Sequence, residues 1–425
     1  MSEQRQGLAN ASDTPPDGLT LRVIRAGGTL CVPVGPGGNL LTEGTLVARG
    51  DALVEPAGVP APSGGRVGRA CEVELIGGRR VRAVELHGDG EHRAETEDAE
   101  REALAGASPE SVSPTGLAAW ASRFVSAGIG AERHGSPDLI QQLHQAIKRP
   151  VDTVICSLID ADPAVKISTL LASRFASEVV EAVVLLGRLL NAKQTLLVVD
   201  QQVAPRWWAS LRRAVKGRPA RVVGVTGSYP AGDPTLLMHR LLGRKLRPGR
   251  LPTECGAIVL DVTAAVAIGR LLRRGQSMLQ SPVAVFDHRS GDVTYCVAPV
   301  GLRVGALMHQ LGLNLENATL RAGDILRDRV ISPDAVVGAG EVAVHVTHDP
   351  APQSPGACIR CGWCVDVCPT GVHPAAVLGA AQSNDVDCAR AFGLDACIEC
   401  GLCTFVCPSK LPLLHGIRVL KSRGT

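Results

Sequence analysis

The chain has 425 residues, enough for two to four domains, and its 45% hydrophobic residues can build a buried core. Lysine plus arginine (44) nearly balances aspartate plus glutamate (41), and aromatic residues make up only 3%, so we expect no nucleic-acid partner. No apolar run is long enough to cross a bilayer, and residues 1–18 are polar and predict a disordered lead-in without a signal peptide. These features predict a cytoplasmic protein.

The first half of the chain changes character near residue 115. Residues 19–85 contain short runs rich in valine and leucine, separated by Gly-Gly pairs, which predict a small β module. The acidic stretch 86–114 predicts a solvated linker. In 115–292, buried strands at 153–158, 195–200 and 221–225 alternate with helices, one of them predicted over 165–191. Such alternation predicts a parallel sheet in a Rossmann-like α/β domain.

Two features of the α/β region are candidate binding elements. Asp160 and Asp162 follow the first predicted strand, where parallel sheets place ligands, although such residues also cap the next helix. Residues 206–274 carry 14 lysines and arginines against three acids. This excess indicates either a face for an acidic partner, a phosphate or a membrane surface, or a solvated surface neutralised elsewhere in the fold.

The rest of the chain divides at residue 348. Residues 293–348 again contain short β-like runs, and nine of the 14 cysteines lie in 349–425. Two runs have the spacing C-x2-C-x2-C-x3-C-P, offset by 39 residues, and in such runs the fourth cysteine binds the other cluster. The predicted ligands of cluster 1 are Cys358, Cys361, Cys364 and Cys407, and those of cluster 2 are Cys397, Cys400, Cys403 and Cys368.

The alternative to two 4Fe–4S clusters is zinc. A zinc site takes four ligands, commonly as two CxxC pairs well separated in sequence. Three cysteines at successive x2 spacing overcrowd a tetrahedral ion, and the run occurs twice, so the pattern favours iron–sulfur chemistry. We interpret Cys388, which lies between the runs, as a buried helix residue without a ligand role.

The order of these parts resembles the C subunit of the Rnf-type ferredoxin:NAD oxidoreductase and the related flavin subunit of respiratory complex I. The segments ACIRCGWCVDVCP and ACIECGLCTFVCPSKLPL carry the most specific likeness. The resemblance implies an α+β multidomain protein: an N-terminal barrel-sandwich β module, a flavin-type α/β domain, an SLBB β-grasp module and a C-terminal α-helical dicluster ferredoxin domain. Further matching residues are Gly50, Asp51, Pro62, Ser63, Gly64, Gly65, Tyr229, Pro230, Gly232, Gly249, Leu251, Pro252 and Gly256.

The resemblance also implies cofactors. The family's flavin segment places FMN against the residues that match Asp160 and Asp162, so FMN is a candidate cofactor here. The family's glycine-rich NADH loop corresponds to residues 130–137, where Glu132, Arg133 and His134 carry side chains. Those side chains would block the close backbone approach that a pyrophosphate needs, which disfavours NADH.

Three functions follow as hypotheses. The first is an iron–sulfur redox subunit of a multisubunit oxidoreductase, relaying single electrons through both clusters. The alternatives are a complete NADH-oxidising FMN subunit, and a scaffold or adaptor subunit of a redox complex. The resemblance implies other subunits as partners, some of them membrane-integral, and a ferredoxin- or flavoprotein-type redox partner. It places the chain at the cytoplasmic face of the inner membrane through those subunits.

Overall fold

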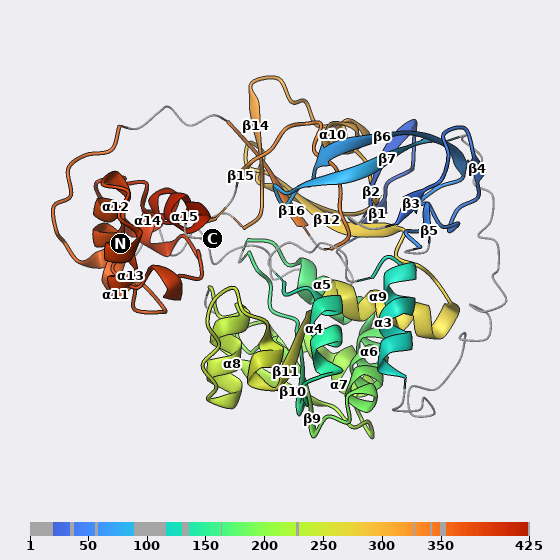
Figure 1. Ribbon diagram of the computed structural model, residues 1–425, viewed down its shortest axis with the longest axis horizontal. Coiled ribbons are helices and arrows are strands. Elements are labelled where there is room, and N and C mark those ends of the chain that lie inside the picture. The colour runs from blue at the N-terminus through green and yellow to red at the C-terminus, as the bar shows by residue number, and fades with distance from the viewer. Residues whose placement is uncertain are drawn as a thin grey trace.

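The computed structural model describes residues 20–34, 38–55, 58–88, 116–129, 136–162, 164–226, 229–324, 326–327, 329–340, 342–348 and 354–423. The predicted lead-in, almost all of the predicted linker, and the substituted loop 130–135 lie outside these residues. Figure 1 shows three bodies: a β-rich body, an α/β body below it and a separate helical C-terminal body.

The N-terminal module is built from antiparallel strands. One sheet has the order β2-β7-β6-β4, and β3 pairs with β5. Side chains from this module share one hydrophobic core with residues from 283–346, so the two β regions stabilise each other. The strands are β2 (Thr29–Pro33), β3 (Asn39–Leu40), β4 (Leu46–Val47), β5 (Val54–Glu55), β6 (Gly65–Glu74) and β7 (Arg80–Gly88).

The second β region is a six-stranded mixed sheet in the order β1-β13-β12-β16-β14-β15, with α10 (Val304–Gln310) beside it. Its first member is β1 (Leu21–Val23), which pairs in parallel with β13, so residues expected in the N-terminal module belong partly to this sheet. The remaining strands are β12 (Gln280–Asp287), β13 (Asp292–Pro299), β14 (Ala318–Ala322), β15 (Arg329–Val330) and β16 (Val342–His348).

The predicted boundary at residue 292 falls inside a hairpin of this sheet. Strand β12 pairs with β13 along its whole length and with β16 on its other side. Residues 280–287, which the sequence placed in the α/β domain, therefore belong to the six-stranded mixed sheet. Their apolar run fits a central strand as well as it fits a parallel α/β strand, so periodicity alone did not separate the two.

The α/β body has a parallel sheet in the order β10-β9-β8-β11. The predicted strands are confirmed as β8 (Thr153–Ser157), β9 (Gln194–Asp200) and β10 (Arg221–Val225), and β11 (Ala257–Asp261) joins them. The helices are α3 (Leu117–Ser126), α4 (Leu139–Ala146), α5 (Ile167–Arg174), α6 (Ala176–Leu189), α7 (Ala209–Ala214), α8 (Pro234–Leu242) and α9 (Val262–Arg274); the 3-10 turns are η3 (Pro205–Trp208) and η4 (Pro252–Cys255).

One helix prediction in this body is wrong. The single helix expected over 165–191 is two helices, α5 and α6, because Phe175 leaves the helical conformation with φ −117° and ψ 39°. The turn allows both helices to pack against α9. The Phe175 ring is covered by the guanidinium of Arg270, 4.5 Å from its centroid.

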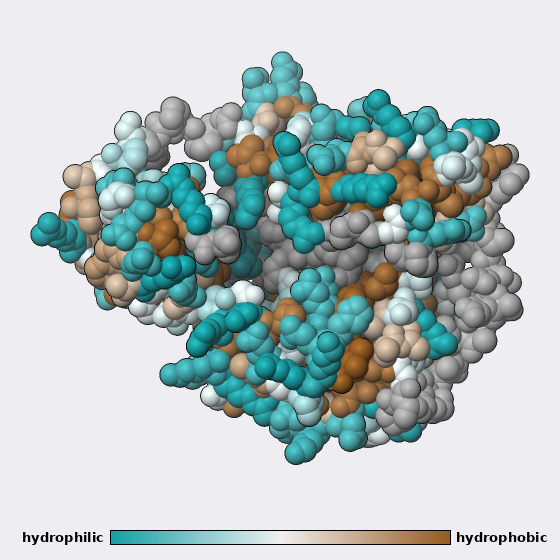
Figure 2. All heavy atoms as spheres, viewed as in Figure 1, coloured by the Kyte–Doolittle hydropathy of each residue, from teal (hydrophilic) through white to brown (hydrophobic). Residues whose placement is uncertain are grey.

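The C-terminal body consists of short helices around a small core in which several cysteines participate. None of the helices in the described part of the chain is long and apolar enough to span a bilayer. Figure 2 shows polar side chains mixed with scattered apolar ones on the visible face. The helices are α11 (Trp363–Asp366), α12 (Pro374–Gln382), α13 (Val386–Ala391), η5 (Leu394–Ala396), α14 (Leu402–Val406) and α15 (Leu413–Arg423).

Candidate iron–sulfur site

The two cysteine runs adopt the same backbone conformation. In each run a glycine with positive φ, Gly362 (82°) or Gly401 (80°), precedes a short helix, α11 or α14. Two residues before each glycine, Arg360 and Glu399 also have positive φ, 54° and 56°. Only glycine adopts positive φ at little cost. The same positive-φ positions in both runs indicate that both loops turn tightly at their cysteines.

The thiols influence one another in two groups. Burial raises the pKa of Cys364, and the thiols of Cys361 and Cys407 raise it further. Burial likewise raises the pKa of Cys400 to about 11, together with the thiols of Cys397 and Cys368. Each group therefore joins cysteines of one run to the fourth cysteine of the other.

Cys403 belongs to the second group. Burial raises its pKa to about 12, and the thiols of Cys397 and Cys400 add to the effect. Within the described residues, no three Cys, His, Asp or Glu side chains converge on the position of a single metal ion. The thiols of each group therefore lie near one another, but they do not surround the position of a single metal ion.

Backbone amides are directed at the sulfurs. The Val372 amide donates to Cys368 Sγ at 3.3 Å, and the Glu399 amide donates to Cys397 Sγ at 3.3 Å. Such N–H···S bonds stabilise negative charge on ligand sulfur and help to set cluster potentials. Crowded thiols that receive amide donors fit the ligand set of an iron–sulfur cluster.

A network of polar residues covers the second run. The Tyr229 hydroxyl lies 2.6 Å from the Cys400 carbonyl oxygen and 3.1 Å from Asp324 Oδ1. The buried Asp324 carboxylate in turn pairs with Arg327. Arg327 also lowers the pKa of Cys400, against the larger opposing effect of burial. The loop after β14 and the segment before α8 thus hold this run against the other two bodies.

A second network lies on the opposite side of the run. Glu399 forms ion pairs with Arg418 (3.1 Å) and Lys421 (3.2 Å) on α15. Lys421 Nζ also donates to the Cys397 carbonyl oxygen at 2.6 Å. Of these four residues, only Cys397 was a predicted site residue. A glutamate between two ligand cysteines, with basic residues on the last helix, was the available signal.

The candidate flavin residues have other partners. Asp160 accepts hydrogen bonds from the amides of Ser168 (2.7 Å) and Thr169 (3.2 Å) and from the Thr169 hydroxyl (2.6 Å). It therefore caps the first turn of α5, which has no cap from its own preceding residue. Burial raises the pKa of the Asp160 carboxyl to about 6.

Asp162 is also engaged by the chain itself. Its Oδ1 accepts from the Ala164 amide at 2.8 Å, and its Oδ2 lies 3.2 Å from Nε2 of the buried His345 on β16. His345 Nδ1 lies 2.9 Å from His288 Nε2. The structure thus places both aspartates near the ends of the parallel strands, but uses them to join α5 and β16 to that edge of the sheet.

The space at this edge of the sheet is small. A cavity of about 70 Å³ lies at the carboxyl ends of β8 and β11, between Asp160, Tyr229 and Arg327. Sites for drug-sized ligands enclose roughly 300–1,000 Å³. Both carboxylates are engaged by the chain itself and the described cavity is small, so we derive no step through a flavin.

Comparisons with known proteins match the same two regions. Residues 134–270 match the model of the Nuo51 FMN-binding domain, and residues 357–412 match the model of a 4Fe-4S dicluster domain. The mixed α/β architecture and the C-terminal ferredoxin-type domain are thereby confirmed.

Curated relatives extend the similarity. The chain is 26% identical over 259 residues to the C subunit of the ion-translocating oxidoreductase complex from Serratia proteamaculans, covering 57% of this chain and 35% of the relative. It is 25% identical over 395 residues to the protein of the same name from Rhodobacter capsulatus, covering 91% and 74%.

A third relative is the C subunit of the proton-translocating ferredoxin:NAD(+) oxidoreductase complex from Clostridium ljungdahlii, 23% identical over 376 residues, with 85% and 78% covered. The chain spans about a third of the length of the Serratia relative and about three quarters of the other two. These matches confirm the resemblance that the motifs indicated.

Proposed function

We propose that this chain, which is related to the C subunits of ion-translocating oxidoreductase complexes, is an electron-transfer subunit that passes single electrons through two 4Fe–4S clusters. The observation that carries the proposal is the packing of both cysteine runs in one small core, within a segment that matches a 4Fe-4S dicluster domain, with the thiols grouped as Cys364 with Cys407 and Cys400 with Cys368. A cubane with exchanged fourth ligands requires this grouping of two runs 39 residues apart.

The ligand sets follow from the grouping. Cluster 1 takes its first three ligands from the loop before α11 and from the first turn of α11, and cluster 2 takes its first three from the loop before α14 and the first turn of α14. When bound, each cluster supplies a one-electron redox centre. The chain's own groups orient the thiolates, donate amide hydrogen bonds to them and exclude water from the second site. The full sets are Cys358, Cys361, Cys364 and Cys407 for cluster 1, and Cys397, Cys400, Cys403 and Cys368 for cluster 2.

The other bodies support the dicluster domain. We assign the N-terminal strands to a barrel-sandwich module and the six-stranded sheet with α10 to an SLBB-type β-grasp module. Because these modules share one hydrophobic core, they form a fixed platform. Asp324 and Leu326 extend from that platform to the second cysteine run, so the platform holds cluster 2 in place.

Partners and location follow from the same proposal. The chain acts with other subunits of a redox complex and associates with a membrane only through them. The complete NADH-oxidising FMN subunit is disfavoured because the strand-end cavity is too small and Asp160 and Asp162 are occupied. The scaffold alternative also keeps the clusters as redox groups, so it is distinguished by whether electrons pass through this chain between a donor and a partner subunit.

Metal and flavin analysis of one preparation tests the proposal. We expect anaerobically purified chain to carry about eight iron and about eight acid-labile sulfide per protein, and flavin far below one per protein. Iron-free, sulfide-free protein, or protein that binds zinc in their place, contradicts the proposal. Stoichiometric FMN that is bleached by NADH instead supports the flavin-subunit alternative.

A further inference from the structure

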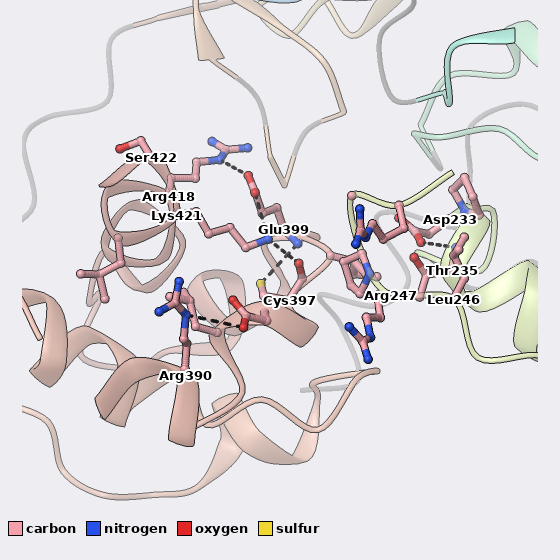
Figure 3. A pocket seen from close by; sticks show the side chains of 18 of the residues that line it. Asp233, Thr235, Leu246, Arg247, Arg390, Cys397, Glu399, Arg418, Lys421 and Ser422 are labelled. Carbon is pink, nitrogen blue, oxygen red and sulfur yellow. Dashed lines mark hydrogen bonds and ion pairs between the residues drawn. The ribbon is translucent and has the colours of Figure 1, made fainter. Parts of the chain in front are cut away.

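A cleft between the α/β and C-terminal bodies lies next to the iron–sulfur site. It measures about 1080 Å³ (Figure 3). One wall is formed by the start of α8 and residues 246–251. The opposite wall is formed by α13, residues 394–399 and α15. The cleft is therefore lined by the dicluster domain on one side and by a domain without cysteine runs on the other.

Positive charge dominates the lining. Six cationic side chains face three acidic ones, so the lining carries a formal excess of three positive charges. Much of this charge is neutralised locally, since Arg418 and Lys421 share Glu399, Arg390 pairs with Asp387 and Asp395, and Arg250 pairs with Glu254. The cations are Arg247, Arg250, Arg329, Arg390, Arg418 and Lys421, and the acids are Asp233, Asp395 and Glu399.

Arg247 is one of the cations available to a ligand. Its side chain is exposed and makes no hydrogen bond or ion pair with any residue in the described ranges. The preceding residue, Leu246, is buried in the core of the α/β body and fixes this stretch of chain. In Figure 3 Arg247 lies on the wall across from Arg390 and α15. An anionic group entering the cleft would thus meet cations from both bodies.

The second cysteine run lies directly behind one wall. Cys397 lines the cleft, yet Cys397 and Ile398 are only 8% and 9% exposed. Their burial keeps the ligand sulfurs out of water but leaves them close to whatever occupies the cleft. A carrier of single electrons needs only such proximity, whereas a hydride donor would need a flavin, which the strand-end cavity of about 70 Å³ does not accommodate.

We propose that this cleft docks an acidic segment of a one-electron carrier protein, and that electrons exchange there with cluster 2. The proposal rests on the function proposed above and names its partner. In the forward direction the reduced carrier loses one electron and cluster 2 gains it, and no bond or proton is transferred. Cations from two bodies would steer the carrier and fix its orientation.

Binding of an acidic plant-type 2Fe–2S ferredoxin, measured by calorimetry on the cluster-loaded chain, tests the proposal. We expect binding that weakens with ionic strength, and Arg247→Glu to weaken it by about tenfold at low salt. The matched control is Arg212→Glu on α7, an exposed arginine in the same body that does not line the cleft. It changes the net charge equally and should alter binding by less than about twofold.

Reduction kinetics provide a second readout. Arg247→Glu should slow reduction by the ferredoxin but leave reduction by methyl viologen, a small cation, unchanged. Arg390→Glu, on the opposite wall, should act in the same direction. Salt-independent ferredoxin binding, or equal effects of Arg247→Glu and Arg212→Glu, overturns the docking site.

The same samples separate this proposal from the function on which it rests. Absence of iron and sulfide contradicts the proposed function. Cluster-loaded protein that methyl viologen reduces, but whose ferredoxin binding ignores Arg247→Glu and Arg390→Glu, contradicts the docking site alone.

Discussion

The two cysteine runs have identical spacing but different surroundings. Ile359 and Ile398 occupy the same position of the repeat, yet Ile359 is 66% exposed and Ile398 only 9%. Cys358 and Cys361 are exposed, whereas their counterparts Cys397 and Cys400 are buried. Spacing therefore determines which chemistry a run supports, and the neighbouring elements determine how water and partners reach it.

The difference arises from docking. Gly401 lies so close to the Leu326 carbonyl that a Cβ on it would overlap that oxygen, whereas a Cβ on Gly362 would have no described neighbour within 4 Å. Tyr229 adds a hydrogen bond to the Cys400 carbonyl. The second run is thus an internal site between three bodies, and the first run is an external site.

We proposed that the fourth cysteine of each run binds the cluster of the other run. Substituting these two cysteines should have the largest effect of all the changes considered. We expect Cys407→Ser to abolish or convert the cluster built on Cys358, while the cluster built on Cys397 persists. Cys368→Ser should give the reciprocal result. EPR spectra of the reduced variants, with iron content measured on the same samples, would show which centre is lost.

The reciprocal pair makes the test specific. If Cys407→Ser removes only the signal of the centre built on Cys397, each run binds its own cluster and the exchange is wrong. Cys388→Ser is the control, because Cys388 lies outside both runs and its substitution should leave both signals intact. Cys388 lies on α13 as predicted, but it is exposed, so the prediction that it is buried was wrong.

Unequal exposure should produce unequal lability. On exposure to air or to an iron chelator, we expect iron loss in two phases, with cluster 1 lost in the faster phase because Cys358 and Cys361 are exposed. Timed EPR spectra would assign each phase. A single phase that removes both centres together would show that the contrast in burial has no chemical consequence.

The sequence predicted the chemistry of the runs better than their placement. Cysteine spacing is local, so the ligands could be read from residues 358–407 alone. The docking of Tyr229 and of residues 324–327 depends on contacts between segments more than seventy residues apart in the chain, which no periodicity encodes. The same limit explains β12, whose apolar run did not reveal which sheet it would join.

Asp160 and Asp162 show a related limit of prediction from the sequence. A carboxylate after a parallel strand fits a ligand site and a helix cap equally well on sequence grounds. Asp160 caps α5 from seven residues before the helix begins, a spacing that local capping rules do not cover.

Matched glycine substitutions measure the docking of the second run. Gly362→Ala should cost about 1–2 kcal/mol, the penalty for a left-handed alanine. Gly401→Ala carries the same penalty and also forces the loop away from Leu326, so we expect a total of roughly 3–5 kcal/mol. Thermal unfolding of both variants, loaded with iron, checks the difference. Equal costs would show that the contact with Leu326 contributes nothing.

The smallest expected effect concerns the charge beside the second run. Although burial opposes it, Lys421 and Arg418 hold the pKa of Glu399 below its ordinary value. A lowered carboxyl pKa stabilises the folded state above the unfolded pKa, near 4.5, and that stabilisation is lost as the pH falls through the lower folded value. Glu399→Gln should therefore cost about 1 kcal/mol at neutral pH and abolish this part of the acid dependence.

The same substitution should change the redox properties of one cluster only. Removing a negative charge next to Cys397 favours the reduced centre, so the midpoint potential of cluster 2 should become more positive. Arg360→Gln is the control at the same position of the repeat, where the side chain is exposed and water screens the lost charge. Redox titration followed by EPR resolves the two centres. Arg360→Gln removes a positive charge, so its shift should be negative and much smaller, because a charge in the enclosed site must act more strongly than one in water. Shifts of equal size and opposite sign would mean that burial does not distinguish the sites electrostatically.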